Sequence, residues 1–341
     1  MKIPAGTNVT LEKIGEFGLI RMIAGKSGRG AGVVIGIGDD AAAFRFTPGS
    51  LALSTTDMLI EGIHFDLSFT DPFRLGRKSL AVNLSDIAAM GGKPTFFLLS
   101  LAVPPTFSAD YLDAFTTGML SLAEEYNVSL IGGDTCASPR GLVISVTAYG
   151  EQVSERIVRR STAREGDLLF VTGTLGDSAL GLELLQRGET AGYPIDRHLD
   201  PIPRVRQGQA LAEAGLPTAM IDVSDGLVAD LRHITDGSAV GAHLRLDRIP
   251  LSRPYRDHYG ITSGDCFVTA LTGGEDYELL FTAPFSKRDA LHALFSELDT
   301  PVTEIGRITL EPGVRVVAPD GMPFMPARGG YDHFRNQKKT G

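Results

Sequence analysis

The stretch VVIGIGDDAA, residues 33–42, passes from β-branched residues into alternating glycines and ends with two adjacent aspartates before small residues. β-Branched residues favour an extended strand, and the glycines indicate a turn after it. Asp40 therefore follows a predicted strand, with little bulk around its carboxylate. Asp and Gly are also common in ordinary turns, so this stretch alone does not distinguish a binding site from a turn.

The same plan recurs at four other places in the chain. In each, an aspartate follows a predicted strand or lies on a helix of small residues, with Gly, Ala, Ser or Thr beside it. The four stretches are STTDMLIEGIHF (54–65), NLSDIAAMGG (83–92), LIGGDT (130–135) and IDVSDGL (221–227). They add Asp57, Asp86, Asp134, Asp222 and Asp225 to the carboxylates that a shared site would contain.

Clustered carboxylates repel one another and raise one another's pKa values, so a shared site needs cations. Asn83 and Asp86 are three residues apart on a predicted helix and lie on one face. Oxygen ligands of this kind suit Mg²⁺, which is usually held by one or two carboxylates together with substrate phosphates. The seven histidines form no HExxH pattern, which argues against zinc.

Composition limits the possible partners. The formal net charge of −9 argues against a nucleic-acid binder, which needs clustered Lys and Arg. No apolar run approaches the roughly 18 residues of a membrane span, and the polar N-terminal residues do not resemble a signal peptide. The two cysteines, Cys136 and Cys266, lie far apart in sequence, which suits a reducing compartment. We therefore expect a cytoplasmic protein that does not bind membranes.

Strand-like and helix-like segments alternate between glycine-rich loops, which predicts an α/β protein. After Gly150 a charged stretch, ERIVRRSTAREGD, precedes a second series of strand and helix patterns, and we place the domain boundary there. The predicted domains are 1–150 and 151–341. Within the first, we expect helices over 11–24, 72–90 and 109–126 and strands over 33–37, 51–55, 95–103, 128–131 and 141–150.

Two stretches mimic standard phosphate-binding loops without matching them. AGKSG (24–28) has the end of a Walker A motif, but Ile20 stands where the first glycine is required. GIGDDA (36–41) shares only its first three residues with the dinucleotide-binding fingerprint. If the protein uses ATP, it does so without either standard loop.

Taken together, the motifs resemble the thiamine-monophosphate kinase family, within the superfamily of aminoimidazole ribonucleotide synthetase and selenophosphate synthetase. The resemblance covers about residues 12–334 and follows the family's order. It is most specific at EGIHF (61–65), GGEDYELLFT (273–282) and GYDHF (330–334). The other matching motifs are GEFGLI, GIGDDAA, KSLAVNLSDIAAMGGKP, LIGGDT, VTGTLGDSALGL, RHLDPIPRVRQGQAL and IDVSDGLVADL.

The resemblance implies a two-domain, aminoimidazole ribonucleotide synthetase-like fold of α/β class (α+β type). Its N-terminal domain would bind ATP and Mg²⁺ and pair its sheet with a second copy in a homodimer. Its C-terminal α/β domain would complete the nucleotide and substrate site. The implied reaction is direct in-line transfer of the γ-phosphoryl group of ATP to thiamine monophosphate, assisted by several Mg²⁺ ions. Its product is thiamine diphosphate, and the reaction is the last step of thiamine diphosphate biosynthesis.

The resemblance also assigns roles to residues of this chain. The metal ligands would be Asp40, Thr55, Thr56, Asp57, Asp86, Asp134, Asp222 and Asp225. ATP would contact Gly133, Asp134, Arg160 and Ser224, and thiamine monophosphate would contact His64, Glu275 and Tyr331. Relatives often carry Trp where this chain has Tyr331, and the chain contains no Trp; a Tyr ring still offers a stacking surface.

The residues leave three alternative functions to consider. One is a ring-closing, ATP-dependent synthetase of the same superfamily. A second, selenophosphate synthetase, is disfavoured because the N-terminal glycine loop contains no Cys. The third is a non-catalytic dimeric nucleotide sensor.

The chain shows no Ser/His/Asp or Cys/His constellation, so we expect metal-assisted transfer with no residue acting as a covalent nucleophile.

Overall fold

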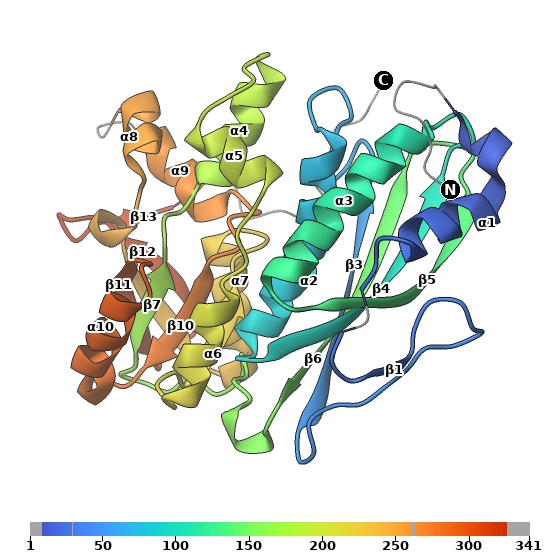
Figure 1. Ribbon diagram of the computed structural model, residues 1–341. Helices are drawn as coiled ribbons and strands as arrows, with labels where there is room; N and C mark the ends of the chain where they lie inside the picture. The colour runs from blue at the N-terminus through green and yellow to red at the C-terminus, as the bar shows by residue number, and fades with distance from the viewer. Residues whose placement is uncertain (1–8, 29, 261–263, 326–341) are drawn as a thin grey trace. The chain divides into compact units, whose positions relative to one another are not determined.

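The chain folds into two compact units (Figure 1). The structure is a computed structural model, and it describes residues 9–28, 30–260 and 264–325. The N-terminal unit comprises Met1–Ile87 and Gly92–Glu155, and the C-terminal unit comprises Ala88–Gly91 and Arg156–Gly341.

The N-terminal unit contains the three helices that the sequence predicts. The third helix follows its N-cap residue Ser108, whose side chain accepts a hydrogen bond from the backbone N–H of Tyr111 at 3.1 Å. The helices are α1 (Leu11–Ala24), α2 (Pro72–Ala89) and α3 (Ala109–Glu125). The strands are β1 (Val33–Ile35), β2 (Ala43–Phe44), β3 (Leu51–Ile60), β4 (Lys93–Val103), β5 (Ser129–Ala137) and β6 (Val143–Gln152).

Two of these strands run further than the sequence predicts. The predicted strand over 51–55 continues to Ile60 as β3, and the one over 128–131 continues to Ala137 as β5. Their additional residues pair with β6 and β4, and this non-local pairing is not visible in local sequence. Asp57 and Asp134 therefore lie within strands and not after them.

Four strands form the main sheet of this unit, in the order β3-β6-β4-β5. β6 is antiparallel to both β3 and β4, whereas β5 is parallel to β4. β3 and β5 are consequently the two edges of the sheet. β1 and β2 form a separate antiparallel pair.

Helices α2 and α3 lie side by side over one face of this sheet (Figure 1). They approach closely at two glycines: a Cβ at Gly76 would lie 1.9 Å from the Phe115 carbonyl oxygen, and one at Gly118 would lie 1.9 Å from that of Phe73. Only glycine allows this contact. Apolar strand residues on the face toward the helices are buried, among them Leu53, Leu59, Leu99, Ile144 and Val146.

The C-terminal unit is built on a second, larger sheet. Its strands are β7 (Leu168–Thr172), β8 (Ala219–Asp222), β9 (Gly241–Arg245), β10 (Leu279–Ala283), β11 (Val302–Thr309), β12 (Gly313–Val317) and β13 (Pro323–Phe324). Its helices are α4 (Asp177–Gln186), α5 (Tyr193–Leu199), α6 (Val205–Glu213), α7 (Leu227–Ser238), α8 (Arg253–Tyr259), α9 (Gly264–Thr272) and α10 (Arg288–Glu297). Short 3₁₀ turns cover Ser154–Arg156, Leu246–Arg248 and Phe285–Lys287.

The order of this sheet is β13-β12-β9-β11-β7-β10-β8. Stacked aromatic rings hold its centre, with Phe281 placed between Phe170 at 5.5 Å and Phe295 at 6.2 Å, measured between ring centroids. β8 is an edge strand and ends at Asp222, where the IDVSDGL stretch turns toward α7. The turn after β8 therefore lies at an edge of this sheet.

Both cysteines are free thiols; Cys136 is exposed and Cys266 is buried. Within the described ranges, none of the helices combines the length and the apolar composition that crossing a bilayer requires.

Candidate active site

The N-terminal unit brings three of the predicted metal ligands together between β3 and α2. The Thr55 hydroxyl donates a hydrogen bond to the Asp86 carboxylate. The backbone N–H of Asp57 donates to Oδ1 of Asn83 at 3.1 Å. Asn83 and Asp86 lie on one face of α2, as the helical spacing predicts, and this face meets the side of β3 that carries Thr55 and Asp57.

The electrostatics of this cluster disfavour a second negative charge. The pKa of Asp57 is raised to about 7, first by burial of its carboxyl group and second by the negative charge of the neighbouring Asp86. A bound cation reverses this balance, because it favours the ionised carboxylate. Thr55, Asp57 and Asp86 thus form an oxygen-rich site suited to a hard divalent cation.

Two further predicted ligands lie on the opposite face of the same sheet. Successive strand residues point to opposite faces, so Thr56 points away from Thr55; its hydroxyl lies 3.1 Å from that of Thr147 on β6. Asp134 pairs in register with the exposed Ser100 of β4, on this same face. It stands on edge strand β5, three strand spacings or roughly 14 Å from edge strand β3. One copy of the N-terminal unit does not bring Asp57 and Asp134 together.

Asp40 lies in the exposed connection between β1 and β2. Its backbone N–H donates to Oδ1 of Asp39 at 2.9 Å, so the first aspartate of the pair stabilises the turn that carries the second. This contact gives Asp39 a local role that the sequence analysis does not assign.

His64 follows β3 in a turn. Its Nδ1 accepts a hydrogen bond from the backbone N–H of Ile60 at 3.0 Å, which in the neutral ring leaves the proton on Nε2. The backbone fixes the ring orientation, and Nε2–H is the remaining donor.

Gly133 lies within β5, against β4. A Cβ at this position would stand 1.8 Å from the Leu99 carbonyl oxygen. Close backbone packing therefore explains this glycine by itself, whether or not ATP contacts it.

The C-terminal unit holds the second group of predicted residues at the turn after β8. One carboxylate oxygen of Asp230, in the first turn of α7, accepts hydrogen bonds from three consecutive backbone N–H groups: Ser224 at 3.0 Å, Asp225 at 3.1 Å and Gly226 at 3.1 Å. Asp225 does not cap α7; instead, Asp230 reaches back from the first helical turn to these N–H groups. The turn carrying Asp222, Ser224 and Asp225 is thereby fixed.

Asp230 is 2% exposed. Burial first and the charge of Asp225 second raise its pKa to about 7, although its backbone hydrogen bonds act to lower the pKa. Ligand atoms of Asp225, Asp230 and His233 all lie within 4.8 Å of one another, so this end of α7 is a second place that could hold a metal ion.

The segment that contains Glu275 packs directly on this turn. The backbone N–H of Glu275 donates to the Ser224 carbonyl oxygen at 2.8 Å, and a Cβ at Gly274 would lie 2.4 Å from that same oxygen. Glu275 has a φ of +66°, a left-handed conformation that is costly for a non-glycine residue. The predicted ATP residue Ser224 and the predicted substrate residue Glu275 are thus neighbours. Glu275 lies in the loop before β10, which begins at Leu279.

Arg160 is not brought to this place. Its carbonyl oxygen accepts a hydrogen bond from the Ser238 hydroxyl at 3.4 Å, at the C-terminal end of α7, whereas Ser224 precedes the N-terminal end. The 12 residues of α7 span roughly 18 Å. Tyr331 falls outside the described residues.

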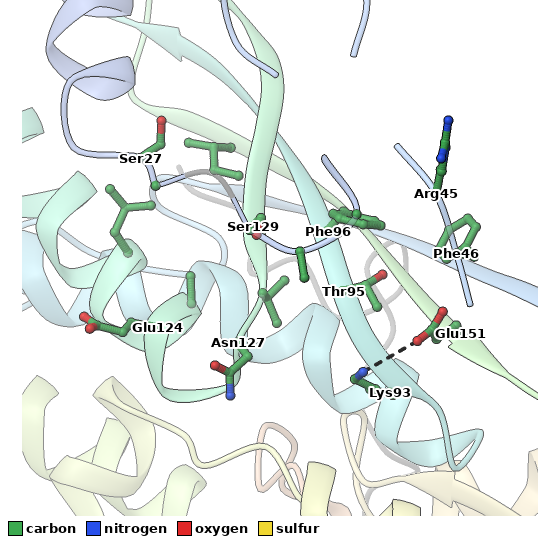
Figure 2. A pocket seen from close by; sticks show the side chains of 18 of the residues that line it. Ser27, Arg45, Phe46, Lys93, Thr95, Phe96, Glu124, Asn127, Ser129 and Glu151 are labelled. Carbon is green, nitrogen blue, oxygen red and sulfur yellow. Dashed lines mark ion pairs between the residues drawn. The ribbon is translucent and has the colours of Figure 1, made fainter. Parts of the chain in front are cut away.

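The N-terminal unit also contains a large cavity. It measures about 1090 Å³ and is lined by parts of the 26–32 segment, β4, α3 and the start of β5 (Figure 2). Lys93 and Glu151 form an ion pair of 3.6 Å at its edge. Among the described residues, none of the predicted metal or substrate ligands lines it, so cavity size alone does not locate the candidate site.

Two residues near the site were missed by the sequence analysis, although both lie in quoted motifs. Asp230 lies in IDVSDGLVADL, where an acidic residue in the first helical turn is a recognisable signal. His198 lies in RHLDPIPRVRQGQAL, and its Nδ1 lies 3.3 Å from the Glu275 carboxylate. No local pattern signals this contact, because 77 residues separate the two in sequence.

The chain matches two family models. Residues 38–152 match the N-terminal domain of AIR synthase related protein, and residues 164–319 match its C-terminal domain. Thiamine-monophosphate kinase from Salmonella typhimurium is 42% identical over 309 residues, 89% of this chain and 92% of that protein. The chain belongs to the thiamine-monophosphate kinase family.

Other members of the family agree with this assignment. The Bacillus subtilis thiamine-monophosphate kinase is 36% identical over 94% of this chain and 99% of its own length. The crystal structure of the Stenotrophomonas maltophilia K279a enzyme superposes with a TM-score of 0.79 at 42% identity, over 89% of this chain and 94% of that one. A structure described as AaThiL complexed with AMPPCP and TMP superposes with a TM-score of 0.73 at 36% identity, over 97% of this chain and 100% of that one. The expected two-domain, aminoimidazole ribonucleotide synthetase-like fold is thus confirmed.

Proposed function

We propose that this protein transfers the γ-phosphoryl group of ATP to thiamine monophosphate and forms thiamine diphosphate, the last step of thiamine diphosphate biosynthesis. Support comes from the family's thiamine-monophosphate kinases and from a relative solved with the ATP analogue AMPPCP and TMP. The observation that carries the proposal is the oxygen cluster of Thr55, Asp57 and Asp86, because joining two phosphates requires that their negative charges be neutralised.

Mg²⁺ is the ion that this cluster fits best. Its donors are carboxylate and hydroxyl oxygens, without sulfur or imidazole, and the raised pKa of Asp57 supports a site in which added positive charge is favourable. When bound, Mg²⁺ would neutralise phosphate oxygens and orient them for in-line transfer. We assign Asp40, Asp134, Asp222 and Asp225 to further ions.

The chain's own residues supply positioning. Ser224 and the backbone of its turn would contact ATP, and Glu275 would accept a hydrogen bond from the aminopyrimidine ring of thiamine monophosphate. His64 Nε2–H and Tyr331 would hold the rest of this substrate. The acceptor phosphate is already ionised near neutral pH, so the reaction needs no strong general base and no covalent intermediate.

A homodimer would shorten the distance between the strand that carries Asp57 and the strand that carries Asp134. Edge strands β3 and β5 each expose backbone N–H and C=O groups on their outer side. A two-fold dimer that joins β3 of one copy to β5 of the other would close the two sheets and bring Asp134 beside the strand that carries Asp57.

Subunit complementation tests the dimer. Asp57→Asn and Asp134→Asn chains are each expected to be inactive, but co-expressed they form mixed dimers in which one site has both native aspartates. Recovery of up to about half of the wild-type activity per mixed dimer is expected under this pairing. No recovery in a verified mixed dimer would contradict the shared site.

The proposed reaction itself is tested by turnover with ATP, Mg²⁺ and thiamine monophosphate, with thiamine diphosphate and ADP followed by chromatography. Thiamine serves as the control acceptor, because it lacks the attacking phosphate. We expect diphosphate only from the monophosphate, and a loss on the order of 100-fold or more in kcat for Asp86→Asn. Asp110→Asn, on the exposed first turn of α3, is the matched control. ADP without thiamine diphosphate would mean a different acceptor, as in a synthetase; ATP binding without turnover would mean a nucleotide sensor.

A further inference from the structure

His198 is a buried histidine that contacts the carboxylate of Glu275, the residue proposed to bind the substrate. It lies near the end of α5 and is 3% exposed. Its Nδ1 lies 3.3 Å from Oε2 of Glu275 and 3.1 Å from Oγ of Ser178 on α4. A carboxylate can only accept hydrogen bonds, so the contact with Glu275 is favourable when Nδ1 carries the proton.

The position of the histidine is fixed by the packing of its helix. α5 meets α4 at Gly181, where a Cβ would lie 2.1 Å from the Pro194 carbonyl oxygen and 3.0 Å from Cβ of His198. Only glycine permits this approach. The ring of His198 is therefore held against α4 and has little freedom to follow a moving partner.

The backbone beneath Glu275 is fixed as well. Glu275 N–H bonds to Ser224, and Tyr277 N–H donates to the Val223 carbonyl oxygen at 2.9 Å. Between them, the Asp276 carboxylate accepts from the N–H groups of Gly176 at 2.7 Å and Ser178 at 3.2 Å. Glu275 and Tyr277 both have positive φ values, +66° and +51°, which persist because this network over-determines them.

What the backbone leaves undetermined is the Glu275 side chain, which has three rotatable bonds and is about 28% exposed. We propose that His198 is a positioning residue for substrate recognition: its Nδ1–H holds Oε2 of Glu275, so that the other carboxylate oxygen faces an N–H donor of the bound aminopyrimidine. The inference rests on the proposed function, in which Glu275 contacts thiamine monophosphate. It adds a specificity determinant for ligands whose heteroaromatic ring carries an amino group.

The test separates loss of a hydrogen-bond donor from loss of packing. His198→Leu keeps an apolar side chain of similar reach without the donor, whereas the amide nitrogen of His198→Asn stands close to where Nδ1 stood. We expect His198→Leu to raise KM for thiamine monophosphate roughly tenfold, the change expected for one hydrogen bond to a charged group. KM for ATP should stay within about twofold, and His198→Asn should recover most of the loss. His258→Leu, an exposed histidine of α8, is the matched control and should change neither KM.

A substrate analogue tests whether His198 orients Glu275 toward the exocyclic amine. An analogue of thiamine monophosphate in which oxygen replaces the exocyclic amine presents no N–H there, so the wild type should discriminate against it. His198→Leu should lose most of this discrimination, because the carboxylate is no longer held toward the amine.

Equal KM values for wild type and His198→Leu, or equal weakening of substrate and analogue, would overturn the inference while the kinase assignment stands. Failure of His198→Asn to recover KM, with melting temperatures unchanged, would also overturn it. If the wild type neither binds nor phosphorylates thiamine monophosphate, the proposed function fails, and the inference fails with it.

Discussion

In the N-terminal unit, Asp57 lies beside Asp86, whereas in the C-terminal unit Glu278 lies between Arg197 and Arg204. Glu278 is 1% exposed, and both arginines bond to it, Arg197 at 2.9 Å and Arg204 at 2.6 and 2.7 Å. Burial raises the pKa of Glu278, but the arginines and their hydrogen bonds outweigh it and hold the pKa below its ordinary value. For Asp57 both causes, burial and Asp86, raise the pKa.

The difference separates a structural cluster from one that binds a cation. Glu278 receives its positive charge from the chain itself, so its cluster is complete in the folded protein and stabilises the segment that bears Glu275. The Asp57 cluster gains from an added cation, which is what a metal-assisted phosphoryl transfer needs. Carboxylate burial alone therefore does not identify function; the sign of the neighbouring charges does.

The largest expected effect is on stability, at Glu278. Glu278→Gln removes the negative charge that pairs with the buried Arg197 and the half-buried Arg204, and Arg197 already has buried Nε and Nη1 atoms without a hydrogen-bond partner among the described residues. We expect a loss of roughly 3–5 kcal/mol in the free energy of unfolding, measured by urea denaturation. Glu304→Gln is the matched control, because Glu304 also pairs with two arginines but is more exposed, with a side chain 18% exposed. It should cost about 1 kcal/mol. Equal losses would show that burial adds nothing to the stabilisation that the Glu278 cluster provides.

The next effect is on cation binding at Asp57. With a pKa of about 7, Asp57 is mostly protonated at pH 5.5 and mostly ionised at pH 8, and the proton must leave before a cation binds. The apparent Mg²⁺ affinity should therefore fall by roughly tenfold or more from pH 8 to pH 5.5. Thermal unfolding with increasing Mg²⁺ reports this affinity as a rise in melting temperature.

Asp57→Asn should remove most of this pH dependence, since Asn does not titrate in this range. A wild-type protein that Mg²⁺ stabilises equally at both pH values would show that Asp57 takes no part in the metal site.

The smallest expected effect is the pH dependence of stability at Asp276. Burial raises the pKa of this carboxyl to about 7, above the roughly 3.9 of an unfolded aspartate. Its folded form therefore retains a proton that the unfolded form loses, so the stability it contributes is full below about pH 4 and is lost as pH rises through about 7. Between pH 5 and pH 8, the melting temperature of the wild type should fall by more than that of Asp276→Asn.

The variant itself is expected to be less stable at pH 5, because the Asn side-chain amide cannot accept from both the Gly176 and Ser178 N–H groups. Melting curves of wild type and variant that shift in parallel with pH would contradict the raised pKa.

Much of the fold follows from local sequence. Helix periodicity predicts α1, α2 and α3 and places Asn83 and Asp86 on one face, because these properties depend on residues three to four apart. Strand ends are predicted less well: Asp57 and Asp134 lie inside β3 and β5, since these strands are extended by pairing with distant partners. The candidate site was predicted as a set of residues, but its arrangement was not.

The sequence by itself determined the chemistry available to this protein: carboxylates and hydroxyls among small residues, without a nucleophile-and-base constellation or a standard phosphate loop. The tertiary structure alone decided which of these groups meet. It placed Thr55 with Asp86 but Asp134 at the other edge of the sheet, fixed the Ser224 turn through Asp230, and set His198 against Glu275. The reason is physical: residue type fixes which bonds a side chain can make, whereas strand order, register and helix packing connect residues far apart in sequence.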